Sequence, residues 1–117
     1  MDIVKLNLTE VRDKIAVREL SATEVTRAVF KRIEETKQLN TLITLDEENA
    51  LKTAAEIDAK LASGKSVGAL GGVPIIVKDN ISTRGLRTTC ASKFLENYVP
   101  PFDATVVKKL KDAGAVI

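Results

Sequence analysis

The sequence predicts a mixed α/β fold, and three observations lead to that prediction. Residues 41–45 and 73–77 are short aliphatic, β-branched runs with the composition of strands. Longer stretches around them repeat their apolar residues every three or four positions, as amphipathic helices do. The final "AVI" at residues 115–117 looks like the opening of another strand. Helices and strands in this alternation favour a mixed sheet covered by helices.

The first forty residues are predicted to form two amphipathic helices. The first begins near residue 9, and its apolar face carries Leu8, Val11 and Ile15. The second begins after Ser21, which forms an S-x-x-E capping box with the glutamate three positions later. This front part, residues 1–40, is therefore expected to be helical.

A third helix is predicted over residues 47–63. Asp46 can accept hydrogen bonds from its first backbone N–H groups, and Gly64 is expected to end it. The glycine-bearing loop that follows lacks the spacing of a phosphate-binding loop, so we interpret it as a mobile connection. It leads into the strand at residues 73–77, which we expect to be central to the sheet, with Ile76 buried.

The remainder of the chain is predicted to be mostly irregular. A short helical turn is expected at residues 93–97, before two prolines that break it. Asp103 is then expected to cap a last helix that runs to residue 113.

Composition excludes several classes of function. Eighteen basic against sixteen acidic residues give a net charge of +2, which provides no electrostatic case for nucleic-acid binding. Histidine is absent, which excludes Ser-His-Asp and Cys-His nucleophile systems and every histidine-containing zinc site. No apolar run approaches the roughly 20 residues that span a bilayer. The single cysteine cannot form an internal disulfide, as expected of a cytoplasmic protein. Any acid–base catalyst must therefore be Lys, Asp, Glu or Tyr.

Lys78 is the candidate catalytic residue. It follows the strand predicted to be buried, where open α/β sheets gather their ligand-binding groups. Burial there would favour the neutral amine, which can act as a general base. A lysine that merely reaches solvent from a strand end is the alternative, and the local pattern leaves both open. Asp79 and Asn80 could orient the amine or a loop, or simply form a turn.

The irregular stretch after Lys78 offers one thiol and several hydroxyls. Cys90 has no activating base nearby, so we interpret it as a small buried side chain. The remaining candidates are interpreted as loop hydroxyls: Ser82, Thr88, Thr89 and Ser92.

The second half of the chain resembles the amidase signature family: "GALGGVPIIVKDNISTRGLRTTCASKFLENYVPPFDATVVKKLKDAGAVI". The pattern G-[IV]-P-[IV]-x-[IV]-K-D-N, here residues 72–80, marks the family at large. Residues 88–107 are similar to its branch of glutamyl-tRNA(Gln) amidotransferase A subunits, and the helical front resembles them more weakly. The resemblance implies that residues 1–117 are the amino-terminal part of one amidase domain. Its helical front covers residues 1–40, and the start of its α/β core covers residues 41–117.

The resemblance also implies a catalytic lysine with two serines. Lys78 matches the lysine, whose neutral amine takes a proton from a bridging serine. That serine activates the nucleophilic serine against the side-chain amide of glutamine. Both serines are expected beyond Ile117, so no serine of this chain is assigned. In the chain alone, Lys78 is expected to be inactive and can be exposed.

Partners follow from the same resemblance. The A subunit would supply ammonia to a B subunit, which uses ATP and magnesium to convert Glu-tRNA(Gln) to Gln-tRNA(Gln), while a C subunit clasps the A subunit. We expect no cofactor, metal or membrane contact for this chain itself. A stand-alone amidase for a small amide and a non-catalytic interaction module are the alternatives. A sheet cut off at its last strand would leave an unpaired edge, so self-association is also expected.

Overall fold

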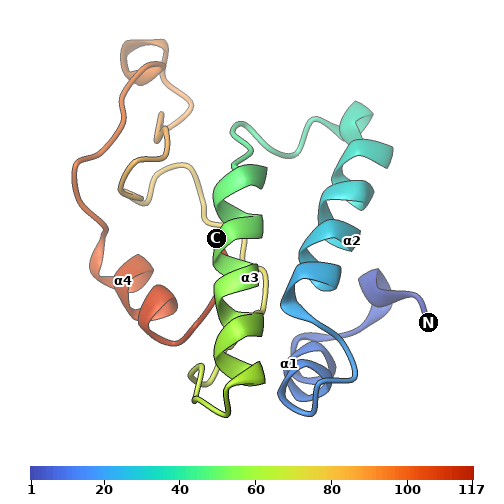
Figure 1. Ribbon diagram of the computed structural model, residues 1–117. Coiled ribbons are helices and arrows are strands. Elements are labelled where there is room, and N and C mark those ends of the chain that lie inside the picture. The colour runs from blue at the N-terminus through green and yellow to red at the C-terminus, as the bar shows by residue number, and fades with distance from the viewer.

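The computed structural model describes residues 1–117 and contains four α-helices and three short 3₁₀ segments. The α-helices are α1 (Leu8–Ala16), α2 (Ala22–Glu35), α3 (Glu47–Ala62) and α4 (Thr105–Asp112). The 3₁₀ segments are η1 (Ile3–Lys5), η2 (Lys37–Leu39) and η3 (Lys93–Leu95). The helices α2 and α3 lie side by side, and α4 lies on the other side of α3 (Figure 1). None of the helices is both long enough and apolar enough to cross a bilayer.

The first two helices, α1 and α2, each begin with a capping box formed by residues close together in the sequence. At α1, the N–H of Glu10 donates to Asn7 Oδ1 (3.0 Å) and the N–H of Asn7 donates to Glu10 Oε2 (2.8 Å). Ser21 and Glu24 form the same reciprocal box at α2, as predicted. The N–H of Ser21 donates to the Glu24 carboxylate and lowers the pKa of that group. Both helix starts therefore follow from side chains within one turn.

The third helix has a predicted end and an unexpected start. Asp46 occupies the N-cap position, but its carboxylate accepts from Asn49 Nδ2 (2.8 Å) rather than from a backbone N–H, so the predicted side-chain cap is wrong. At the other end, the N–H of Lys65 donates to the Lys60 carbonyl (2.9 Å) across Gly64, whose φ is 74°. This is a Schellman motif, and it confirms that Gly64 ends the helix.

The core lies where α1, α2 and α3 meet the segment around Val73 and the last residues of the chain. Nine buried residues form one cluster: Val11, Ile15, Ala22, Val25, Ala50, Ala54, Ile57, Val73 and Val116. Asp58 of α3 also holds the start of α2, because its carboxylate accepts the N–H groups of Ala22 (2.7 Å) and Thr23 (3.0 Å). From the sequence we expect the 73–77 segment to pack against the 47–63 helix or the 103–113 helix, and Val73 lies in the same buried cluster as three residues of α3.

The predicted sheet does not form. Only two isolated bridges occur, a parallel one between Pro74 and Val116 and an antiparallel one between Thr83 and Leu86. A strand needs a neighbour that accepts and donates repeatedly along its length. The N–H of Ile75 donates to the Val116 carbonyl (2.7 Å), and the N–H of Val116 donates to the Val73 carbonyl (2.9 Å), but these bonds make a single bridge and no ladder.

Residues 41–45, the other expected strand, make no backbone–backbone hydrogen bonds and remain an irregular segment. Ile76 is 71% exposed, so its predicted burial is wrong for this chain. Both errors have the same cause, since a strand-like sequence is buried and paired only where other segments cover it.

The glycine-bearing loop is held firmly, contrary to the prediction of a mobile connection. The N–H of Leu70 donates to the Ala113 carbonyl (2.8 Å), and the N–H of Gly72 donates to the Gly114 carbonyl (2.9 Å). Gly71 and Gly72 are buried. The loop therefore packs closely against the end of the chain.

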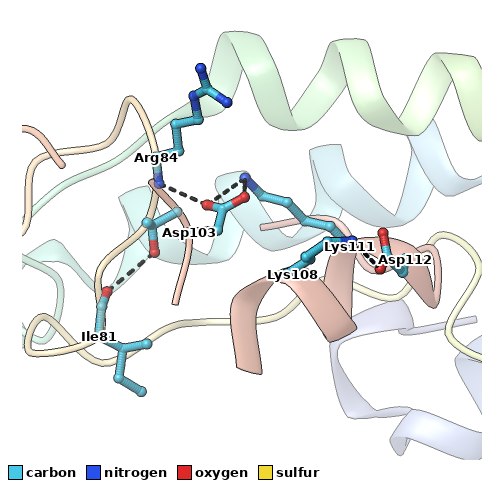
Figure 2. A network of polar contacts seen from close by, with 7 residues as sticks. Ile81, Arg84, Asp103, Lys108, Lys111 and Asp112 are labelled. Atoms are coloured by element: carbon cyan, nitrogen blue, oxygen red, sulfur yellow. Dashed lines mark hydrogen bonds and ion pairs between the residues drawn. The ribbon is translucent and has the colours of Figure 1, made fainter. Parts of the chain in front are cut away.

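Asp103 does not cap α4 as predicted, and Ala104 occupies the N-cap position instead. The Asp103 carboxylate accepts from the N–H of Arg84 (2.7 Å) and from Lys111 Nζ (2.9 Å to each oxygen) (Figure 2). Burial alone would raise the pKa of Asp103, but the hydrogen bonds from Lys111 and Arg84 outweigh it and lower that pKa. The predicted helical turn after residue 92 is confirmed as η3.

Candidate active site

Lys78 lies where the 73–77 segment leaves the core. Its carbonyl accepts from the N–H of Ile81 (3.0 Å), so the two residues close a β-turn with Asp79 and Asn80 at its centre. The turn that these two residue types favour is therefore present. The side chain of Lys78 is exposed and forms no ion pair within 4.0 Å.

A groove of about 780 Å³ runs beside Lys78. One wall is the apolar face of α2, which contributes Val29, Phe30 and Ile33. The irregular segment at residues 41–46 forms a second wall, and residues 74–81 form a third. Most of the lining is hydrophobic, so an amine enclosed there would lose hydration and favour its neutral form.

No serine lines this groove, and its hydroxyls come from threonines. Ser82 and Ser92, the two serines that follow Lys78 in this chain, are absent from the lining. The structure therefore brings no serine of this chain together with Lys78 in the groove. No three His, Cys, Asp or Glu side chains are placed to hold a metal ion.

Asp79 joins the turn at Lys78 to the loop at residues 88–91. Its carboxylate accepts from the N–H of Thr89 (2.8 Å), the N–H of Ala91 (3.2 Å) and the hydroxyl of Thr89. Its backbone carbonyl accepts from the N–H of Cys90 (2.9 Å). The bond from the Thr89 hydroxyl is the main cause that lowers the pKa of Asp79. From the sequence Thr89 is interpreted as a loop hydroxyl, but it joins its loop to Asp79 through two hydrogen bonds. No pattern of sequence spacing indicates this contact.

Cys90 is exposed, which corrects the prediction of a buried side chain. The backbone N–H groups of the loop and the buried Thr89 hold its conformation, so the position of Cys90 does not depend on burial of its side chain. Cys90 and Ala91 both have left-handed backbone conformations, with φ of 51° and 54°.

Arg87 fixes the wall formed by residues 41–46. Its guanidinium donates to the Ile43 carbonyl (3.3 Å), to Thr44 Oγ1 (3.3 Å) and to the Glu96 carbonyl (3.1 Å). The segment predicted as a strand is thus held by a side chain rather than by a ladder. Sequence reasoning missed this contact because the partners are 43 and 44 positions away.

Comparison with known proteins shows which family this chain resembles. Residues 24–117 match the family model described as Amidase. The A subunit of glutamyl-tRNA(Gln) amidotransferase from Carboxydothermus hydrogenoformans is 51% identical over 117 residues, which cover 99% of this chain and 24% of that protein. The protein of the same name from Thermoanaerobacter pseudethanolicus is 48% identical over 118 residues, covering 100% of this chain and 24% of that protein. The chain spans about a quarter of the length of these relatives.

Solved structures extend the likeness to three dimensions. The peptide amidase from Stenotrophomonas maltophilia has a TM-score of 0.87 and 34% identity, covering 94% of this chain and 23% of that chain. A fatty acid amide hydrolase has a TM-score of 0.90 and 32% identity, covering 97% of this chain and 20% of that chain. The family match, the relatives and the structures agree over nearly all of the sequence, and the chain belongs to the amidase family.

Proposed function

We propose that residues 1–117 are part of the A subunit of a glutamyl-tRNA(Gln) amidotransferase. In this proposal the A subunit hydrolyses glutamine, and the ammonia converts Glu-tRNA(Gln) to Gln-tRNA(Gln). The supporting observation is 51% identity, over 99% of this chain, with a protein of that name. The peptide amidase and the fatty acid amide hydrolase reach only 34% and 32%.

Lys78 is the general base of the proposed reaction. In the complete active site the amine is enclosed, and desolvation favours its neutral form. It takes the proton of a bridging serine, which takes the proton of the nucleophilic serine as that oxygen attacks the amide carbon of glutamine. The C–N bond then breaks and the proton passes to the nitrogen, which leaves as ammonia. Water hydrolyses the acyl-serine to release glutamate.

Both serines belong to sequence beyond Ile117 in this proposal. The absence of serine from the lining of the Lys78 groove supports that assignment. Lys78 is exposed in residues 1–117, so in this proposal the segment that encloses its amine also belongs to that further sequence. Residues 1–117 alone are therefore proposed to have no glutaminase activity.

The partner proteins supply the remaining steps. A B subunit uses ATP and magnesium to activate the tRNA-bound glutamate, and a C subunit clasps the A subunit. The net charge of +2 favours a division of labour in which the partner provides the cationic surface for tRNA.

The test replaces Lys78 in the full-length protein assembled with its partners. Lys78→Ala should lower glutamine hydrolysis by roughly 10²–10⁴-fold, the usual contribution of a general base. Lys78→Arg should fail equally, because a guanidinium keeps its proton at working pH. Added ammonium should restore amidation of the tRNA in both variants. Lys65→Ala, in an exposed loop outside the groove, is the control and should leave turnover unchanged. Near-normal hydrolysis by Lys78→Arg would show that Lys78 is not the base.

A stand-alone amidase is the second candidate, which the TM-scores of 0.87 and 0.90 to the peptide amidase and the fatty acid amide hydrolase favour. Co-purification of two partner proteins, with ammonia-dependent amidation of tRNA, would support the amidotransferase. Activity on small amides without partners would support the stand-alone enzyme. Glutaminase assays with and without the sequence beyond Ile117 would test whether residues 1–117 form only an interaction module.

A further inference from the structure

The loop at residues 88–91 has a conformation that needs support. Cys90 and Ala91 are consecutive non-glycine residues with φ of 51° and 54°. L-amino acids disfavour this left-handed region, and it persists where surrounding contacts over-determine the backbone. The residue that makes these contacts is therefore the one on which the loop conformation depends.

Asp79 supplies those contacts. It accepts the N–H groups of three successive residues, taking Thr89 (2.8 Å) and Ala91 (3.2 Å) on its carboxylate and Cys90 (2.9 Å) on its carbonyl. The Thr89 hydroxyl adds a further hydrogen bond to the carboxylate. One residue thus fixes the whole turn of the loop, and the loop in turn fixes both the side chain and the backbone of Asp79.

This arrangement bears directly on Lys78. The carbonyl of Lys78 is held by the N–H of Ile81 (3.0 Å), and the next carbonyl, that of Asp79, is held by the N–H of Cys90 (2.9 Å). The Lys78 side chain itself has no ion-pair partner and is exposed. The backbone sets the direction of the Lys78 Cα–Cβ bond, from which the amine extends, and the Asp79 contacts hold that backbone.

Asp103 offers a natural comparison. Its carboxylate also accepts a backbone N–H, that of Arg84, and a side-chain donor, Lys111. It ties the backbone at Arg84 to Lys111 of α4 (Figure 2). Asp103 does not line the Lys78 groove, whereas Asp79 does. A role special to the site should therefore appear at Asp79 and not at Asp103.

We propose that Asp79 is a positioning residue that, through Thr89 and Ala91, holds the 88–91 loop and so aims the amine of Lys78 at the group whose proton it takes. This inference rests on the proposed function, in which Lys78 is the base. It assigns no contact with substrate to Asp79.

The experiment compares variants of the full-length protein in its assembled form, by kcat and KM for glutamine hydrolysis. Asp79→Asn places an amide NH₂ against backbone donors, and Thr89→Val removes the hydroxyl at nearly constant shape. Each should lower kcat roughly 10- to 100-fold, as expected of a misplaced catalytic group, with KM little changed. Thr89→Ser keeps the hydroxyl and should retain near-normal kcat. Asp103→Asn is the matched control and should leave kcat unchanged.

Several outcomes would overturn the proposal, and each is separable from the base assignment. If Lys78→Ala abolishes turnover while Asp79→Asn and Thr89→Val keep normal kcat, Asp79 does not position the amine. A raised KM at unchanged kcat would mean that the loop serves substrate binding instead. Fully additive losses in a variant that combines Asp79→Asn with Thr89→Val would show that Asp79 and Thr89 do not act through one contact. If Asp79→Asn does not fold, Thr89→Val decides. If Lys78→Ala itself keeps normal turnover, the proposed function fails first.

Discussion

Residues 1–62, here called the front region, and residues 63–117, the rear region, differ in how much of their structure is encoded within one helical turn. The front region consists mainly of three helices, two of which begin with capping boxes closed within three positions. The rear region has one eight-residue α-helix, and its irregular segments are held by contacts such as that between Asp79 and Thr89, ten positions apart. Two helix starts of the front are thus encoded locally, whereas the shape of the rear depends on which separate segments meet.

The largest expected effect on the free energy of unfolding is at Gly114, which is packed inside the rear region. We compare it with Gly64, at the end of α3. A Cβ at Gly114 would overlap the Val67 carbonyl oxygen and lie 3.0 Å from Gly71 Cα, at a φ of 88°. Gly114→Ala should cost about 2–5 kcal/mol of unfolding free energy, from left-handed strain and overpacking together. Gly64→Ala, with no atom within 4 Å of its Cβ, should cost only the strain, about 1–2 kcal/mol. Equal losses in urea unfolding would contradict the contrast.

The next effect tests whether the front region is held only by local contacts. Asp58 lies 36 positions from Ala22, and it accepts two backbone N–H groups and the Thr23 hydroxyl (2.6 Å) at the start of α2. Asp58→Ala leaves these donors without their partner and should cost about 1–3 kcal/mol. Ser21→Ala, which removes the local cap, should cost about 1 kcal/mol. If thermal melts show Asp58→Ala to be the milder change, the start of α2 depends on its local box alone.

The same contrast explains what the sequence can predict of the fold. The capping box at α2 and the helix end at Gly64 are predictable because their signals lie within one or two helical turns. Asp46 and Asp103 do not cap helices as expected, since each is a suitable cap residue whose carboxylate accepts from another donor. The expected strands do not form, because a ladder depends on neighbours that no local pattern specifies.

The candidate site divides in the same way. Lys78 and the turn that follows it are predictable from a short motif, and the family match includes both. The contacts that shape the site are not predictable, because Arg87 donates to residues 43 and 44 positions away. The interpretation of Thr89 as a loop hydroxyl is wrong for the same reason, since no spacing rule links it to Asp79.

A smaller difference in the free energy of unfolding is expected between Val73 and Ile76, two positions of the 73–77 segment. Val73 is buried in the core cluster, so Val73→Ala should cost about 1.5–2 kcal/mol for the two carbon groups lost. Ile76 is 71% exposed, and Ile76→Ala in residues 1–117 should cost less than about 0.5 kcal/mol. In the full-length protein we expect Ile76 to be covered and the cost to rise to about 2–5 kcal/mol. An equally small cost there would show that the segment stays at the surface.

Self-association of residues 1–117 stays a prediction. Exposed Ile76 and the apolar lining of the Lys78 groove offer a surface that a second copy could cover. Sedimentation should show a species heavier than a monomer, and Ile76→Lys should shift it towards the monomer. A monomer with a sharp melt in the unchanged chain would count against it.

The smallest effect is a response to acid confined to the rear region. The pKa values of Asp79 and Asp103 lie below the ordinary value for aspartate, about 3.9. A lowered pKa in the folded state means that the carboxylate stabilises the fold fully above the ordinary value, and that this stabilisation is lost as pH falls through the folded-state pKa. Amide chemical shifts of Thr89 and Ala91 should therefore move below about pH 4, while those in the middle of α3 stay constant. Asp79→Asn should abolish the response at Thr89 and Ala91 and leave that of Arg84, which reports on Asp103. If the amides of α3 shift at the same pH, acid unfolds the chain as one unit, and the two regions are not separable in stability.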